Sequence, residues 1–151
     1  MTFPLPAPMR RALDVAQQAG LAGEVPVGAV LVRNDAIVAV AGNRMRHGHD
    51  PTAHAEMVVL REGAALLGTS RLDDCDLWVS LEPCTMCAAA ISLARVRRLY
   101  FAAMDPKGGA VVSGPRLYHA PSCHHRPEIY PGIGEAEAAA MLRDFFRERR
   151  T

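Results

Sequence analysis

The sequence has little of several features that would fix its class at once. No run of about 18 apolar residues is present to span a bilayer. The opening MTFPLPAPMRR lacks the charged and then apolar order of a secretory signal. The formal net charge is only +1, so any contact with nucleic acid must come from a local patch. We therefore expect a cytoplasmic protein with no membrane partner, and composition neither suggests nor excludes an RNA partner.

Length and composition favour one folded unit. The chain has 151 residues, of which 50% are hydrophobic, so it can bury one full core but is short for two. No internal repeat is visible, and the 12 glycines and 11 prolines are spread between apolar runs, as in a globular domain. A single domain over residues 1–151 is the expectation.

Hydrophobic periodicity predicts helices alternating with strands. Helices are predicted over 8–20, from a cap at Asp50 to about 68, over 83–94 and over 134–150. A hairpin is predicted over 26–42 with its turn at Asn34 and Asp35, and further strands over 77–81 and 99–103. The proline-containing segment 113–134 is predicted to be irregular. This alternation favours an α/β layered fold with a mixed sheet.

Three potential zinc ligands fall in the first turns of two predicted helices. His54 lies in one, and Cys84 and Cys87 lie in the other. Residues three apart share a helix face, and a helix N-terminus favours the thiolate that binds metal. One imidazole and two thiolates leave the fourth tetrahedral position open for water, as catalytic zinc sites do. The set therefore predicts a hydrolytic site.

Glu56 is the expected proton shuttle. It follows His54 by two residues, about 200° around an ideal helix, so it is not expected to be a ligand from the same face. A carboxylate beside zinc-activated water can take its proton and later deliver protons to a leaving nitrogen. The predicted reaction adds water to an amidine-like carbon and releases ammonia.

The cysteine pair alone has other interpretations. C-x-x-C is also typical of thioredoxin-like redox sites and of half a zinc ribbon. The redox interpretation lacks an aromatic neighbour and leaves His54 and Glu56 unexplained. A structural zinc site lacks a convincing fourth ligand, although Cys75 or Cys123 could supply it. Otherwise these two cysteines are expected to be ordinary thiols.

Two motifs carry a resemblance to a known family. AHAE at 53–56 and EPCTMC at 82–87 resemble the two halves of the cytidine-deaminase-superfamily zinc signature, H-x-E followed by P-C-x-x-C. The resemblance implies a three-layer α/β/α fold with a central mixed five-stranded sheet flanked by helices. It also implies one Zn²⁺ per subunit, with the ligands and the proton shuttle named above.

A wider set of segments resembles the bacterial tRNA-specific adenosine deaminases, which convert the wobble adenosine of an anticodon to inosine. The matching segments are EVPVGAVLV at 24–32, GN at 42–43, DPTAHAE at 50–56, LWVSLEPCTMCAAAI at 77–91, DPKGGA at 105–110 and DFFRERR at 144–150. The resemblance implies a tRNA anticodon arm as partner and a homodimer whose second subunit completes the RNA-binding surface. No DNA partner is expected.

The same resemblance implies roles for residues outside the zinc motifs. Asn43 would hydrogen-bond the flipped nucleoside, and Val27 with Leu81 would line the base pocket. Asp105 and Lys107, in the loop after the 99–103 strand, would meet the neighbouring nucleotides. These five residues are the expected substrate pocket.

The last predicted helix supplies the stacking and cationic groups that a loop-binding enzyme needs. Phe146, Arg149 and Arg150 are the expected RNA contacts, with Phe145 and Arg147 beside them. Adjacent helical positions cannot both face the core, so one phenylalanine should pack and the other should be open to solvent or a partner. The helix dipole also favours arginines at a helix C-terminus.

The segment SCHHRPEIYPG departs from the family pattern. His124 stands where many members carry an asparagine, and its ring nitrogen can contact a ribose or base, although it can also carry a charge. His119 and His125 are expected to be surface residues or loop braces. This departure leaves fine substrate preference open.

Two other functions remain open from sequence. One is a zinc-dependent deaminase of a free nucleobase or nucleoside, of the guanine or cytosine type, because such enzymes share the zinc motifs. The other is a zinc-stapled RNA-binding module without catalysis. In the second case, replacing Glu56 by glutamine should leave every measurable property of the protein unchanged.

Overall fold

Five strands form one mixed sheet in the order β2-β1-β3-β4-β5 in the computed structural model, which describes residues 4–149. Its strands are β1 (Gly28–Arg33), β2 (Ala36–Gly42), β3 (Cys75–Leu81), β4 (Arg98–Ala103) and β5 (Glu128–Pro131). β1 is antiparallel to both β2 and β3, whereas β3, β4 and β5 run parallel. The predicted mixed five-stranded sheet is confirmed.

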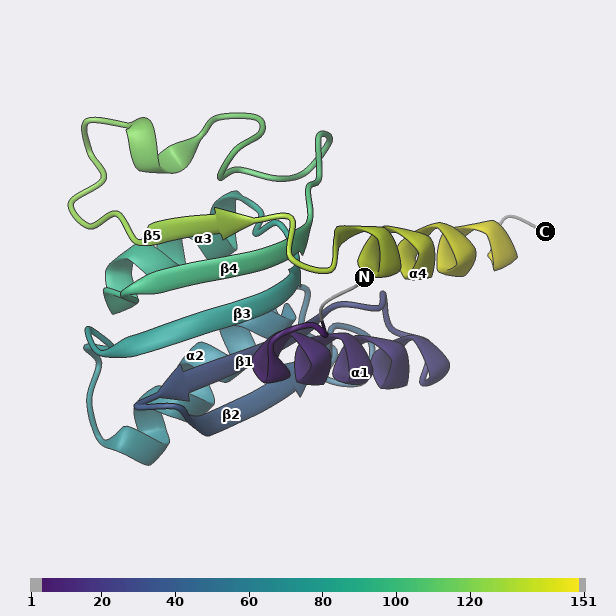
Figure 1. The fold of residues 1–151 in the computed structure, drawn as a ribbon, viewed down its shortest axis with the longest axis horizontal. Coiled ribbons are helices and arrows are strands. Elements are labelled where there is room, and N and C mark those ends of the chain that lie inside the picture. Colours follow the sequence, from purple (N-terminus) through teal and green to yellow (C-terminus); the bar gives the residue numbers. More distant parts are fainter. Residues whose placement is uncertain (1–3, 150–151) are drawn as a thin grey trace.

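Four helices cover the two faces of this sheet (Figure 1). They are α1 (Ala7–Leu21), α2 (Ala55–Leu67), α3 (Thr85–Ala94) and α4 (Glu135–Glu148). α1 and α4 share one apolar cluster with the sheet, and α2 and α3 share the other. The three-layer α/β/α expectation is therefore confirmed. Within residues 4–149, no helix is long and apolar enough to cross a membrane.

Alternation along β1 shows how the two layers are separated. Ala29 and Leu31 face the α2 and α3 layer, while Val30 and Val32 face the α1 and α4 layer. Gly28, at the start of β1, lies so close to α1 that a Cβ there would collide with the backbone carbonyl oxygen of Ala12. This close packing fixes α1 over the end of the sheet that leads into the functional site.

The segment 113–134 is more ordered than the sequence predicts. It contains a 3-10 turn, η1 (Leu117–His119), and the edge strand β5. Ile129 and Tyr130 pair with Leu99 and Tyr100 of β4. The strand has four residues and ends at a proline, so its formation depends on pairing with β4 and leaves little local signal. The prediction of an irregular segment was wrong here.

Candidate active site

The predicted ligands lie at the N-termini of α2 and α3, and both helices begin later than predicted, so that two of the ligands precede the first turn. His54 and Cys84 are N-cap residues with extended backbone, and the helices begin at Ala55 and Thr85. The Asp50 side chain caps a separate turn, accepting a hydrogen bond from the Thr52 N–H at 2.9 Å, and does not start the helix. The prediction that His54 and Cys84 belong to the first turns was therefore wrong by one residue.

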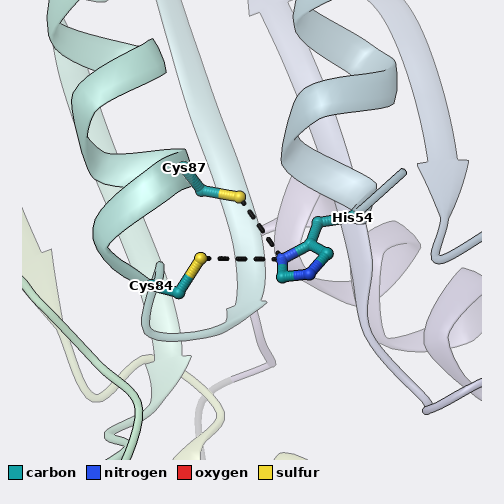
Figure 2. A group of neighbouring side chains, drawn as sticks. All are labelled: His54, Cys84 and Cys87. Carbon is teal, nitrogen blue, oxygen red and sulfur yellow. Dashed lines mark hydrogen bonds between the residues drawn. The ribbon is translucent and has the colours of Figure 1, made fainter. Parts of the chain in front are cut away.

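The three ligand side chains converge on one point between the helices (Figure 2). His54 Nδ1 lies 3.6 Å from Cys84 Sγ and 3.6 Å from Cys87 Sγ. All three ligand atoms lie within 4.8 Å of one another. Tetrahedral zinc, with Zn–S of about 2.3 Å and Zn–N of about 2.1 Å, places N and S about 3.6 Å apart. Both the donor chemistry and the spacing fit zinc.

The other two cysteines do not belong to this cluster. Among the described residues, the group that could hold a metal comprises His54, Cys84 and Cys87 alone. Cys75 is buried at the start of β3, and Cys123 Sγ donates to the carbonyl oxygen of His125. The structure thus brings no fourth protein ligand from residues 4–149, as expected for an open catalytic site.

Hydrogen bonding within the cluster favours a thiolate at Cys84. The hydrogen bond from Cys87, followed by that from His54, lowers the pKa of the Cys84 thiol to about 4. The reciprocal bond with Cys84 raises the pKa of His54. The same partner and burial raise the pKa of Cys87, so the first thiolate forms at Cys84. A preformed thiolate beside an imidazole is a suitable start for zinc coordination.

Glu56 lies beside the ligands in the first turn of α2 and is 3% exposed. Burial raises the pKa of its carboxyl group to about 7. It is not among the residues of the ligand cluster, as the sequence predicted. A buried carboxyl group that titrates near neutrality can both accept and return a proton.

Asn43 supports the start of α2. Its side-chain Oδ1 accepts a hydrogen bond from the Ala55 N–H at 2.8 Å, and its Nδ2 donates to the carbonyl oxygen of Val25 at 3.2 Å. Ala55 lies between His54 and Glu56, so Asn43 helps to place both. Sequence reasoning missed this second function, because its partners are 12 and 18 residues away.

Comparison with known proteins identifies the family. The model of the cytidine and deoxycytidylate deaminase zinc-binding region matches residues 6–103. A tRNA-specific adenosine deaminase of Agrobacterium fabrum is 56% identical over 142 residues, which cover 94% of this chain and 93% of that relative. This chain belongs to the tRNA-specific adenosine deaminases of the cytidine and deoxycytidylate deaminase family.

Solved structures with this fold include deaminases that are named for different substrates. One, from a study of A-to-I editing by tRNA:A34 deaminases at the wobble position of transfer RNA, has a TM-score of 0.88 and 55% identity, covering 89% of this chain and 98% of that one. A guanine deaminase of Bacillus subtilis has a TM-score of 0.65 and 32% identity, covering 95% of this chain and 92% of that one. Deaminases of different substrates therefore share this architecture.

Several of the predicted substrate residues lie around a cavity of about 410 Å³ between the ends of β3 and β4 and the helix α4. Three of them, Leu81, Asp105 and Phe146, line this cavity. Sequence reasoning missed the other lining residues, which are Val25, Ala103, Met104, Ala139, Leu142 and Arg143. Val27 is 5% exposed and belongs to the core cluster beside α2. The family resemblance gave no role to Arg143, which also lines this cavity.

Asp105 and Lys107 lie on the loop that follows β4. Asp105 Oδ1 accepts hydrogen bonds from the backbone N–H groups of Lys107 and Gly108, at 3.2 and 3.0 Å. This turn leaves the Lys107 side chain exposed. The loop thus presents one fixed carboxylate and one cation to solvent.

The two adjacent phenylalanines of α4 differ as predicted. Phe145 is 7% exposed, whereas Phe146 is 47% exposed and reaches the cavity described above. The guanidinium carbon of Arg149 lies 3.7 Å above the centre of the Phe145 ring. Arg147 pairs with Asp144 at 3.6 Å. The predicted contact Arg150 lies outside the described residues.

His124 does not lie on the cavity that Phe146 reaches. It is exposed on the rim of a second hollow, of about 310 Å³, beside Leu93 and Arg95 near the C-terminal end of α3. Its neighbour His125 forms a hydrogen bond through Nε2 to the carbonyl oxygen of Val96, at 2.6 Å, and so braces the loop as expected. His119 is exposed at the end of η1.

Glu82 is a functional candidate that sequence reasoning missed. It precedes Pro83 and Cys84, and its side chain is 2% exposed. Burial raises the pKa of its carboxyl group, but hydrogen bonds from the loop after β4, including those from Asp105 and Ser113, outweigh burial and lower it. A glutamate directly after a predicted apolar strand was the available signal.

Proposed function

We propose that this protein deaminates the wobble adenosine of a tRNA anticodon to inosine by hydrolysis, with one zinc ion bound by each subunit. The observation that carries the proposal is the likeness to the tRNA:A34 deaminase structure, at 55% identity over 89% of this chain. The ligand cluster of His54, Cys84 and Cys87 and the buried Glu56 supply the matching chemistry. Residues 1–151 act as one deaminase domain.

The reaction converts adenosine and water to inosine and ammonia, and Glu56 moves the protons. His54, Cys84 and Cys87 would hold the zinc ion, which would lower the pKa of water from about 15.7 towards about 7 and so supply a nucleophile at neutral pH. The Glu56 carboxylate accepts a proton from the water that attacks C6 of the base. It delivers this proton to the ring nitrogen N1, then accepts the proton of the new C6 hydroxyl group and passes it to the amino group, so that ammonia leaves as the C6 carbonyl of inosine forms.

The remaining pocket residues hold the flipped base and its neighbours. Asn43 offers its remaining amide hydrogen to the nucleoside, and its two hydrogen bonds within the protein support this role because they leave that hydrogen unused. Val27 and Leu81 form the apolar wall of the base pocket. Asp105 and Lys107 meet the adjacent nucleotides, because their loop borders the cavity that Leu81 lines.

The C-terminal helix binds the anticodon loop through stacking and charge. Phe146 is exposed at the cavity and can stack on an unpaired base. Arg149 and Arg150 contact phosphates near the end of α4. His124 is exposed on the rim of the other hollow, away from the Phe146 cavity. From this rim it contacts the ribose or base of RNA that extends past one subunit.

We further propose that the protein is a homodimer that acts on tRNA in the cytoplasm. The lining of the hollow beside the C-terminal half of α3 includes the apolar residues Ala89, Leu93 and Leu117, and Leu93 is 82% exposed. A second copy would cover this surface and extend the RNA-binding surface past one subunit. Leu93→Glu should convert a dimer to a monomer in sedimentation equilibrium, and an unchanged mass would remove this role for the hollow.

Parallel incubations test the substrate. Zinc-loaded protein should form inosine in an anticodon stem-loop with a wobble adenosine and release one ammonia for each inosine. A stem-loop with guanosine at the wobble position is the matched control and should release none. Guanine and cytosine, supplied as free bases, test the alternative raised by the guanine deaminase likeness. Ammonia from a free base, without inosine in the stem-loop, would overturn the proposal.

A further inference from the structure

The side chain of Glu82 accepts five hydrogen bonds although it has almost no contact with water. Its Oε1 accepts from the Asp105 N–H and the Ser113 hydroxyl, both at 2.9 Å. Its Oε2 accepts from the backbone N–H groups of Val111, Val112 and Ser113, at 3.0, 2.9 and 3.0 Å. The carboxylate is 2% exposed. Every donor comes from one segment, 105–113, which we call the substrate loop.

No cation of the described residues pairs with this buried charge. The ion pairs within residues 4–149 do not include Glu82, so the N–H and O–H dipoles of the substrate loop balance its charge. Five donors and no acceptor face the carboxylate. A glutamine amide would present two donors of its own to this shell and could not satisfy it. The arrangement therefore requires a carboxylate.

Glu82 also belongs to the turn that carries a metal ligand. Its backbone N–H donates to the carbonyl oxygen of Ala103 at 2.8 Å, which ties it to the end of β4. The next residue, Pro83, accepts a hydrogen bond from the Ala110 N–H of the substrate loop at 2.9 Å. Cys84 follows at once. Two consecutive residues thus join the ligand turn to the loop.

We propose that Glu82 is a positioning residue, whose carboxylate holds the substrate loop against the turn that bears Cys84 so that Asp105 and Lys107 meet the nucleotides beside the target adenosine. The inference rests on the proposed function. It explains why Ala110 and Val111 are buried while Lys107 at the tip is exposed. Fixing the buried half of the loop sets the position of its exposed half.

A double-mutant cycle between Glu82→Gln and Lys107→Ala tests the inference. Steady-state kinetics on the anticodon stem-loop and zinc content would be measured for the wild type, both single variants and the double variant. Glu82→Gln should retain zinc, keep kcat within about threefold and raise KM about ten- to a hundredfold. Lys107→Ala should raise KM when it is the only substitution. It should have little further effect on KM in the Glu82→Gln background, because the lysine is already misplaced there.

Additive effects on KM, or an unchanged KM in Glu82→Gln, would overturn the inference. A matched control is Asp76→Asn at the other end of β3. Asp76 is a largely buried carboxylate that pairs with Arg97 at 3.0 Å. Its loss should lower the unfolding temperature without changing KM. Zinc loss and a parallel fall in kcat for Glu82→Gln would instead make Glu82 part of the metal site and also overturn the inference.

A second variant keeps the test decisive if Glu82→Gln does not fold. At Gly109, a Cβ would run into the Glu82 carboxyl carbon and lie 2.6 Å from the Asp105 carbonyl oxygen. Gly109→Ala should therefore displace the substrate loop with the charge intact and raise KM in the same way. An unchanged KM here would overturn the inference.

One measurement is independent of activity and separates the two proposals. If the wild type forms no inosine, the proposed function fails. Faster hydrogen exchange of the Val111 and Val112 amides in Glu82→Gln or Gly109→Ala would still support the restraint of the loop, and unchanged exchange would overturn it.

Discussion

Replacing Glu56 by glutamine should remove activity while leaving the fold and the metal in place. The side chain is 3% exposed, so bulk water cannot take over its proton transfers. General acid–base catalysis contributes about 10²–10⁴-fold, which is about 3 to 5 kcal/mol at about 1.36 kcal/mol per tenfold. We expect the loss to lie at the upper end, because one group serves both the attack of water and the departure of ammonia.

The stability of Glu56→Gln should rise or stay unchanged although its activity falls. Burial raises the pKa of the Glu56 carboxyl group to about 7, which means that the fold disfavours its charged form. Glutamine has nearly the same shape and carries no charge to desolvate. The unfolding temperature of metal-free Glu56→Gln at pH 8 should therefore equal or exceed that of the metal-free wild type. Active sites with a buried catalytic carboxyl group are commonly less stable than a variant that lacks the charge and the activity.

The assay would follow inosine formation in the stem-loop, zinc content and thermal unfolding on the same preparations. Glu62→Gln is the matched control, because it makes the same change on the exposed side of α2, where Glu62 pairs with Arg44 at 3.0 Å. It should leave turnover unchanged. Turnover of Glu56→Gln within about threefold of the wild type would refute its role as proton shuttle. No turnover in either protein, with zinc and RNA binding retained, would favour a zinc-bound RNA-binding module without catalysis. Loss of zinc would show that Glu56 acts as a ligand.

Three further predictions follow from the same structure. Cys87→Ser should lower zinc content and inosine formation together, as metal analysis beside the assay would show; full zinc occupancy would contradict the ligand assignment. Phe146→Ala should weaken stem-loop binding about five- to 150-fold, at about 1–3 kcal/mol for one stacked base; Leu66→Ala, at an exposed residue of α2, is the control in binding titrations and should have no effect. Burial raises the pKa of Glu24, but hydrogen bonds from His47 outweigh it and lower the net value. The carboxylate therefore stabilises the fold above its unfolded pKa of about 4.3 and loses this contribution as pH falls through the folded value. Urea unfolding between pH 3 and 6 should show a shallower acid dependence for Glu24→Gln, and equal slopes would contradict the account.

The metal site could be predicted because its signal is local. Cys84 and Cys87 are three residues apart, and His54 precedes a second helix, so residue type and spacing alone suggest a shared ligand set. The errors of four residues in the predicted cap of α2 and of two residues in the predicted start of α3 did not matter, because an N-cap residue and the third residue of the first turn can still face the same point. Local chemistry thus gave the reaction class before any tertiary contact was known.

The substrate side depends on contacts that no local pattern carries. The hydrogen bonds to the Glu82 side chain join residues 23 to 31 positions apart. β5 forms only because β4 offers its edge, and residues 128–131 carry no alternation long enough to predict it. Neither the order of the strands nor the separation of His124 from the Phe146 cavity could be read from spacing.

The metal site depends on local sequence and the substrate-binding segments depend on long-range contacts. This difference bears on how substrate choice can change within one architecture. A guanine deaminase and a tRNA:A34 deaminase both resemble this fold, so the layout of the sheet and helices does not by itself select the substrate. Selection must then lie in segments outside this shared layout, and the structure presents two that meet at one cavity: the substrate loop and α4. The loop is fixed through Glu82 to the ligand turn, whereas Phe146 projects from a helix on the other layer. A change in either segment can alter which nucleotides bind while the distances among His54, Cys84 and Cys87 stay the same.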